Sequence, residues 1–394
     1  MQKLREYPDK RANCCSATGN PGFQINDAYP KTHILCLPIS WLFYRLSYKH
    51  QVNGQVKGAN IMRLLLAAIL IAALGWSGFW WIGARNINQN LTDWLDTRHQ
   101  AGWVANYSSL DTNGFPNRFD TEIRDIELVD THTGIAWTAP FFQLFRLSYE
   151  QSHVIAVWPN QQVVATPNQR IDIRSDDIRA SLVLRDTDTW LLDRMNLVVD
   201  DLSLSSSNDW SARIEQSLFA MRPSERVPAA IDLALKATNV HPKNPALTTL
   251  AEMGAIPRTI ESLDIDLSVT FDAPLDRRVI EVGRPNITAL DLHVLKSKWG
   301  GLELWAAGDL TLDSQGRATG SITIKAKNWR EMLQLAKASG WIPDAAVDPL
   351  TTGLGFIATL SGSKQTLDAP LTFDRGNVSF GPIPLGTLPP IKMR

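Results

Sequence analysis

Two pairs of aspartates have a spacing that could hold a divalent cation, Asp186 with Asp188 and Asp264 with Asp266. In an extended segment alternate residues point to the same face, so each pair would present two carboxylates, the ligands that Ca²⁺ and Mg²⁺ prefer. The second pair, however, alternates with leucine and isoleucine, a pattern typical of a strand with one wet and one dry face. We therefore interpret Asp264 and Asp266 as the solvent side of a strand.

Histidine and cysteine, the other common metal ligands, are poorly placed for that role. The seven histidines lie far apart, without a His-Glu-x-x-His motif, whereas a zinc site needs at least three convergent ligands. The three cysteines, Cys14, Cys15 and Cys36, all precede residue 62, so the rest of the chain has no thiol nucleophile. We expect neither a metal site nor a cofactor.

Sequence motifs for catalysis are missing as well. Residues 316–320 contain two glycines but lack the Gly-Lys-Ser/Thr of a phosphate loop, and no Gly-x-Ser-x-Gly elbow is present. A hydrolase built from Asp and His residues would need groups distant in sequence to converge in a cleft. We therefore predict that the protein is not an enzyme.

The most informative segment is an apolar run from Leu64 to Ile82, which has no charged side chain. At a rise of about 1.5 Å per residue, roughly twenty apolar residues match the hydrocarbon thickness of a bilayer. The run is longer than the core of a secretory signal and ends in a cluster of tryptophans, so we predict an uncleaved transmembrane anchor over residues 62–85. Cleavage after a small-residue site near Ala72, or a buried core helix, are the alternatives. The predicted anchor residues are Leu64, Leu65, Leu66, Ile69, Leu70, Ile71, Leu74, Trp76, Phe79, Trp80, Trp81 and Ile82.

Residues 1–61 differ in composition from the rest of the chain. They hold every cysteine, 8 of the 39 Lys and Arg residues and 3 of the 40 Asp and Glu residues, and they show no sustained apolar period. Met62 and Arg63 before the apolar run would be a complete start for an export signal. We therefore predict a non-native or disordered leader over residues 1–61, with a genuine cytoplasmic extension as the alternative.

The region after the anchor alternates between apolar and polar residues in many short segments. In residues 231–236, 263–271, 302–312 and 320–326 every second residue is apolar, and turn-forming residues separate such segments. This pattern predicts a mainly β protein, a β-rich α+β fold, with either one long antiparallel twisted sheet or two related β-rich halves. We place the halves at residues 86–225 and 226–394, because a Pro-rich stretch follows residue 225.

A few segments show helical spacing instead. Apolar residues recur at three and four in Asn90–Trp103, which we expect to continue the anchor helix, and in Asn328–Gly340. Trp210–Met221 is a weaker helical candidate. We predict further strands at residues 355–360, 371–373 and 377–380, and a Pro/Gly-rich tail after them.

Several short motifs resemble an alphaproteobacterial family known as domain of unknown function 2125. They are Gly114-Phe-Pro-Asn-Arg118, Trp137-Thr-Ala-Pro140 and the ending Leu371-Thr-Phe-Asp-Arg-Gly-Asn-Val-Ser-Phe-Gly-Pro-Ile-Pro-Leu-Gly386. The resemblance covers nearly all of residues 62–394. It implies a membrane-anchored, exported protein of unassigned function, with no catalytic residues to carry over. More loosely, the hairpin from Leu302 to Ala326 is similar to the repeated strands of AsmA-like envelope proteins, which are anchored at the inner membrane and implicated in handling lipids.

A long sheet with one apolar face either packs that face into a core or leaves part of it open as a groove. We expect a non-enzymatic protein, anchored by a single pass in the Gram-negative inner membrane, whose periplasmic domain binds or handles lipid. The alternative is a structural or assembly partner that binds another envelope protein through sheet edges or the region from Trp299 to Trp305. The chain after residue 61 is net acidic and has no Lys/Arg stripe, so we expect no nucleic-acid partner. The residues of the predicted apolar groove are Leu263, Ile265, Leu267, Val269, Phe271, Leu290, Leu292, Leu302, Leu304, Leu310, Ile322 and Ile324.

Overall fold

The computed structural model describes residues 55–227, 229–252, 256–276, 278–281, 285–338, 344–360, 362–380 and 383–392. The predicted leader lies outside these residues up to position 54, and residues 55–61 are helical. The chain forms two compact units, residues 1–66 and 67–394. The first unit is described only in its helical part, so the account below concerns the second.

Helix α2 spans Gln55–Gln100 and runs without a break through the predicted anchor and the segment after it. Every side chain from residue 61 to residue 75 is exposed. The helix is long and apolar enough to cross a membrane, with a mean hydropathy of 1.9 in its most apolar stretch. It ends at Gln100, shortly before Gly102, which adopts a φ of +85°. A candidate spanning helix near the N-terminus is thus compatible with single-pass anchoring.

The second half of α2 has an apolar stripe that packs on the sheet. Trp80, Ala84, Ile87, Leu91 and Leu95 follow one another at spacings of three and four residues, which brings them to one side of a helix. Leu95 is only 2% exposed and Ala84 7%. The same helix therefore has two parts, one apolar on all sides and one amphipathic.

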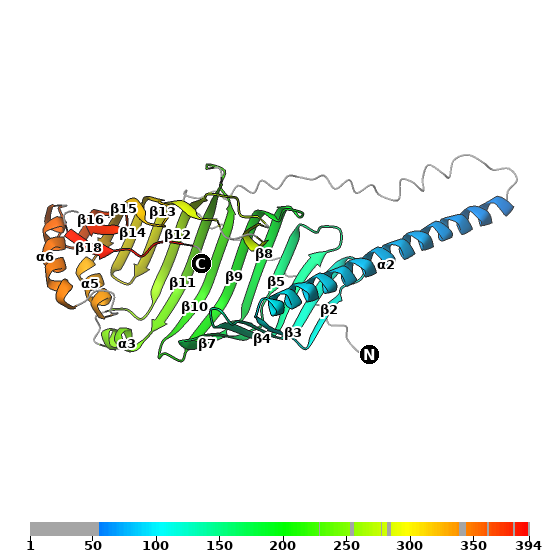
Figure 1. Ribbon diagram of the computed structural model, residues 1–394, viewed down its shortest axis with the longest axis horizontal. Coiled ribbons are helices and arrows are strands. Elements are labelled where there is room, and N and C mark those ends of the chain that lie inside the picture. The colour runs from blue at the N-terminus through cyan, green and yellow to red at the C-terminus, as the bar shows by residue number, and fades with distance from the viewer. Residues whose placement is uncertain are drawn as a thin grey trace, which may run out of the picture. The chain divides into compact units, whose positions relative to one another are not determined.

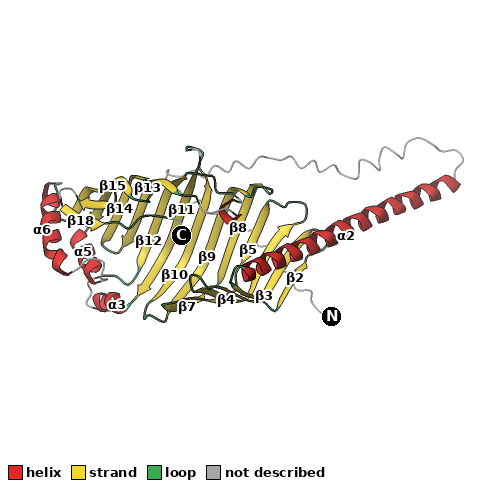
Figure 2. Cartoon of the chain, viewed as in Figure 1, coloured by secondary structure: helices red, strands yellow, loops and turns green. Residues whose placement is uncertain are grey.

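Among the described residues, 18 strands join into one antiparallel sheet. Figures 1 and 2 show this sheet as a long row of neighbouring strands. This confirms the mainly β fold with a long antiparallel sheet. The strands are β1 Val104–Asn106, β2 Ser109–Asn113, β3 Arg118–Asp130, β4 Ile135–Leu147, β5 His153–Val157, β6 Gln161–Thr166, β7 Gln169–Arg174, β8 Asp177–Asp186, β9 Leu191–Ser206, β10 Ser211–Pro223, β11 Ala230–Lys243, β12 Ile260–Phe271, β13 Ile287–Trp299, β14 Leu302–Leu312, β15 Ala318–Lys327, β16 Thr366–Asp374, β17 Asn377–Phe380 and β18 Ile383–Thr387.

The sheet is a meander with two irregular regions. In the first, β1 and β2 both pair with β3. From β9 to β18 each strand pairs with the next one along the chain. Between the long strands β4 and β9, two short pairs lie end to end: β5 and β8 bridge one end, and β6 and β7 bridge the other. The pairing of β10 with β11 makes the sheet continuous across residue 225, where we predicted a boundary between halves. The division into halves stays a prediction.

One face of the sheet is apolar over most of its length. Met195, Met221, Leu233, Leu267 and Leu292 are paired across five successive strands, β9 to β13, and paired residues share a face. We call this the apolar face. The opposite face has rows of polar residues and is called the polar face.

Helices α3 (Pro245–Glu252), α5 (Trp329–Ala338) and α6 (Asp344–Leu360) lie toward the β18 end, as Figure 2 shows. Trp329 and Leu333 of α5 and Leu354 and Ala358 of α6 form a core cluster with Leu367 and neighbouring residues of the apolar face. The short helix α4 covers Arg278–Glu281. The predicted helix over Asn328–Gly340 is confirmed as α5, although residues 339 and 340 lie outside the described residues.

Three local predictions were wrong. Trp210–Met221 forms most of β10 rather than a helix, because this strand has apolar residues on both faces, such as Leu218 and Phe219, and this mimics helical spacing. Residues 355–360 end helix α6 rather than forming a strand, because Leu354, Ile357 and Ala358 pack together on the helix–sheet core. The tail contains a strand, β18, which pairs with β17.

Candidate functional site

A large apolar hollow lies on the apolar face beside helix α2. It is a groove of about 700 Å³ whose floor comes from strands between β3 and β10 and whose walls come from α2 and from the segment that leads into α4. We call it the α2 groove. Its lining residues are Ile87, Asn90, Leu91, Phe119, Thr121, Leu144, Arg146, Gln151, Val154, Leu182, Leu184, Thr187, Trp190, Leu192, Met221, Leu275, Asp276 and Val279.

Helix α2 approaches the floor of the groove closely because a glycine faces the sheet. A Cβ atom at Gly83 would lie 2.6 Å from Cζ of Phe119, whose side chain is 2% exposed. One turn earlier, the ring of Trp80 stacks on that of Phe119 with 5.8 Å between centroids. The indole N–H groups of Trp76 and Trp80 donate to the carbonyl oxygens of Pro116 and Arg118 at 2.8 and 2.7 Å. These contacts fix the helix against the hairpin that opens the sheet.

Arg146 is the cation of this apolar lining. Strand β4 pairs it with Phe119 on one side and Val154 on the other, and both neighbours line the groove. Its side chain is half-buried, and its guanidinium carbon lies 5.6 Å from the centre of the Phe119 ring. Burial lowers the pKa of this guanidinium, which nevertheless stays protonated at neutral pH. Within the described part of the chain, no carboxylate lies at ion-pair distance from Arg146.

The groove also holds one carboxylate, and this group has its own partner. Asp276 accepts hydrogen bonds from Nε of Arg278 at 2.9 and 3.0 Å and from Nη2 at 2.6 Å. Hydrogen bonds from the Arg278 side chain and backbone lower the pKa of Asp276. Asp276 is therefore paired with Arg278, two positions later in the chain. It does not form an ion pair with Arg146.

The twelve predicted groove residues share the apolar face, as their cross-strand register shows. Val269, Phe271, Leu302 and Leu310 are buried, and the other eight are half-buried. None of the twelve lines the α2 groove. They lie on β12 to β15, farther along the same face, where Val269 and Phe271 pack with Met221 and Leu275 at the groove's end. Their predicted contact with a ligand stays a prediction.

The predicted anchor residues lie on α2, and all but Trp80 are exposed. Sequence reasoning assigned Trp76 and Trp80 to the membrane interface but missed their contacts with the hairpin, which depend on residues about forty positions later. It also missed the α2 groove and Arg146, because a single arginine in a strand gives no signal of its surroundings.

Ser268, His293 and Asp232 lie close together, and these are the residue types of a hydrolase triad. On the polar face Ser268 Oγ donates to Asp232 Oδ1 at 2.6 Å and lies 2.9 Å from Nε2 of His293. Nδ1 of His293 faces Nη1 of Arg226 at 3.3 Å. In a catalytic triad the histidine stands between the serine and the acid, whereas here the serine stands between the other two. The arrangement is a polar chain that satisfies the buried Ser268.

Asp264 and Asp186 both have positions that fit a structural role. Asp264 lies between Lys236 and Lys296 on its two neighbouring strands, which fits its interpretation as the wet side of a strand. Asp186 accepts hydrogen bonds from the backbone of Asp188 and the hydroxyl of Thr189 in a turn. Among the described residues no group of three His, Cys, Asp or Glu side chains could hold a metal ion.

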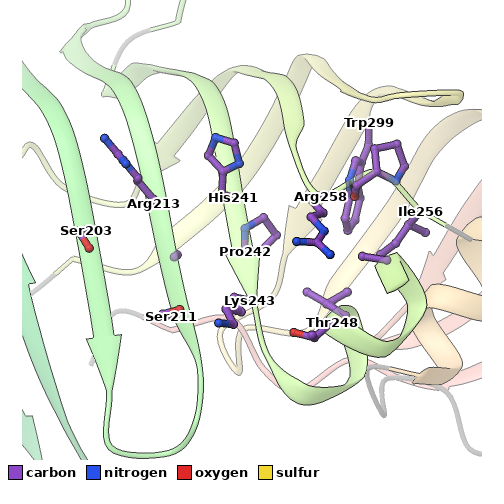
Figure 3. A pocket seen from close by; sticks show the side chains of 14 residues that line it. Ser203, Ser211, Arg213, His241, Pro242, Lys243, Thr248, Ile256, Arg258 and Trp299 are labelled. Carbon is purple, nitrogen blue, oxygen red and sulfur yellow. Dashed lines mark hydrogen bonds between the residues drawn. The ribbon is translucent and has the colours of Figure 1, made fainter. Parts of the chain in front are cut away.

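A second hollow, of about 330 Å³, lies where β10 and β11 meet α3. Figure 3 shows Arg213, His241 and Arg258 around it, with Lys243 near its lower edge. Arg213 is bound by Asp201 through two hydrogen bonds of 2.7 and 2.9 Å, and His241 by Thr259 at 2.9 Å. Lys243 and Arg258 are exposed. Because its charges are solvated or paired, this hollow is a weaker candidate than the α2 groove.

Comparison with known proteins gives one result. The model of a family described as "Uncharacterized protein conserved in bacteria (DUF2125)" matches residues 80–389. No curated protein and no solved structure matches the chain.

Proposed function

Because the chain belongs to the DUF2125 family, and this membership itself specifies no activity, we propose a function from the α2 groove: the protein binds lipid at a membrane. In this proposal α2 anchors it by a single pass in the inner membrane of a Gram-negative cell, and the sheet lies in the periplasm. The protein acts by binding rather than by catalysis.

The observation that supports this proposal best is that one helix serves both as candidate anchor and as groove wall. Ile82 ends the apolar run, and Ile87 and Leu91 line the groove. Ile87 follows Ile82 by five positions in the α-helix, a rise of about 7.5 Å along the axis. A groove so close to the end of an anchor is within reach of bilayer lipids.

The chemistry of the lining points the same way. Leucine, valine, phenylalanine and methionine side chains form most of the floor, and six of the eighteen lining residues are polar or charged. Burying an acyl chain against them releases about 25 cal/mol for each Å² of apolar surface removed from water. Pockets for small ligands commonly combine such an apolar lining with a few polar groups that orient the ligand.

Bound lipid can be measured directly on the full chain. The protein is purified in mild detergent, its lipids are extracted and they are quantified by mass spectrometry. Val154→Glu places a carboxylate in the groove floor, whereas Ile155→Glu changes the next residue of β5, which is 37% exposed on the polar face. We expect the wild type and Ile155→Glu to retain lipid and Val154→Glu to lose most of it. Equal lipid in all three proteins would refute binding in the groove.

The alternative, an assembly partner, draws support from the sheet's edge. Among the described residues strand β18 pairs only with β17, and an unpaired edge can accept a strand from another protein. The region from Trp299 to Trp305 is less available than we expected, since Trp299 donates to Pro257 O at 2.6 Å and packs with Leu302 and Leu335. Crosslinking that captures one stoichiometric envelope protein, from a preparation free of bound lipid, would favour this alternative.

A further inference from the structure

Arg146 gives the α2 groove a charge that its apolar lining does not explain. The guanidinium has five N–H donors. Among the described residues, the guanidinium interacts with the face of the Phe119 ring, whose centre lies 5.6 Å from its carbon atom. A half-buried charge without an anionic partner is costly, and such groups usually bind a counter-charge. Since Asp276 is held by Arg278, no carboxylate among the described residues supplies this anion, and a bound ligand can.

The position of Arg146 along the groove indicates what kind of anion it meets. Phe119, over which the guanidinium lies, packs on Trp80 and faces Gly83. These helix residues flank Ile82, the end of the apolar run. Arg146 is therefore at the anchor's end of the groove, whereas Met221 and Leu275 lie at the other end, beside the core cluster of Val269 and Phe271.

We propose that the α2 groove binds an anionic phospholipid drawn from the bilayer, with its phosphate paired to Arg146 and an acyl chain lying toward Met221. This inference rests on the proposed lipid-binding function and specifies the lipid class and the residue that recognises it. Guanidinium and phosphate form paired, charge-assisted hydrogen bonds. Interfacial phosphates lie at the depth where an anchor leaves the hydrocarbon core, which is the end of the groove that Arg146 occupies.

The test is a competition between two lipids that differ in head group alone. Full-chain protein in detergent is equilibrated with equal amounts of phosphatidylglycerol and phosphatidylcholine of the same acyl chains, and native mass spectrometry counts the lipids bound. We expect the wild type to select phosphatidylglycerol. Arg146→Gln should reduce its retention by about 10- to 100-fold, the loss expected for hydrogen bonds to a charged group.

Three controls separate a lost contact from a lost fold. Arg124→Gln removes an exposed arginine that pairs with Glu122 on the polar face of β3 and should leave selectivity unchanged. Arg146→Gln should leave the melting temperature of the delipidated protein unchanged or higher, because it removes an unpaired charge. Arg146→Lys should retain part of the selectivity, since it keeps the charge but loses the planar fork.

The outcomes are distinct. Lipid binding that is indifferent to Arg146→Gln would overturn this inference while leaving the proposed function intact. Selective uptake of a free fatty acid in place of the phospholipid, in a parallel competition, would overturn the assigned lipid class. Failure of the wild type to bind any lipid would refute both the inference and the proposed function.

Discussion

The indole nitrogen of Trp80 lies 2.7 Å from the carbonyl oxygen of Arg118, so the candidate membrane helix is hydrogen-bonded directly to the first hairpin of the sheet. The same indole stacks on Phe119 and meets Phe115 edge to face. Its neighbour Trp81, by contrast, is 58% exposed. The part of the helix around Trp80 is therefore built into the folded domain.

Replacing Trp80 should test this attachment. Trp80→Phe removes the hydrogen bond to Arg118 but keeps an aromatic ring, so we expect it to lower the free energy of unfolding by about 1 kcal/mol. Trp81→Phe, one residue later, should have little effect because its side chain is exposed. Thermal unfolding of the full chain in detergent measures both. Equal losses in the two variants would show that the indole contact is not stabilising.

Gly83 should resist substitution although it lies in a helix. Alanine ordinarily stabilises a helix by about 1 kcal/mol relative to glycine. Here the added methyl would overlap Phe119 and force it to move, which typically costs about 1–3 kcal/mol. Gly75→Ala is the control, because no atom outside its own helix lies within 4 Å of its Cβ position. We expect Gly83→Ala to melt below the wild type and Gly75→Ala not to. A gain of stability in Gly83→Ala would contradict the close packing.

The stability that the Asp276–Arg278 pair gives to the groove wall before α4 should fall as the pH is lowered. The pKa of Asp276 is lowered from its ordinary value by its hydrogen bonds with Arg278. Its contribution to stability is therefore complete above the unfolded pKa, about 3.9, and is lost as the pH falls through the lowered folded value. We expect the wild type to melt above Asp276→Asn at pH 6 and the difference to shrink below about pH 4.

Arg278→Gln provides the control for this pair. The difference in melting temperature between the wild type and Arg278→Gln should also shrink below about pH 4. The double variant should melt only slightly below either single variant, because both substitutions remove the same interaction. Additive losses, or a melting-temperature difference that does not narrow as the pH falls below about 4, would mean that the pair does not stabilise this wall.

The hairpin tip beside the anchor should lie at the membrane surface. Trp76 donates to Pro116, and Phe115 is 55% exposed, so the tip follows the end of the apolar run. A fluorophore on Phe115→Cys, in a chain with its native cysteines replaced by serine, should be quenched by lipids with quencher-labelled head groups. Ile135 is 48% exposed and follows the β3–β4 turn, at the opposite end of β3 from Phe115. The same label on Ile135→Cys should not be quenched. Similar quenching at both sites would contradict this placement.

The strands with one apolar and one polar face were predictable from sequence because their pattern depends only on neighbouring residues. Residues 263–271 show it in β12, and residues 302–312 show it in β14. The pattern failed in β10, where Leu218 and Phe219 make both faces apolar, and in α6, whose Gly-rich apolar end resembles a strand. Local spacing does not distinguish these cases, because strand pairing and helix packing decide them.

The candidate site was predictable only in part. The alternation identified the face on which the α2 groove lies, but not the part of that face where the groove forms. That depends on Gly83, which lets α2 approach Phe119, and on the register that sets Arg146 between Phe119 and Val154. Both are relationships between residues distant in the chain, and no local motif marks them.

Photocrosslinking inside the groove tests the central claim most directly. A photoreactive amino acid replaces Leu182 in the groove floor or, as a control, Leu218, which is 41% exposed on the polar face. After illumination of membranes that contain the full chain, we predict a lipid adduct at position 182 and none at position 218. No adduct at position 182, or equal adducts at both positions, would contradict lipid binding in the α2 groove.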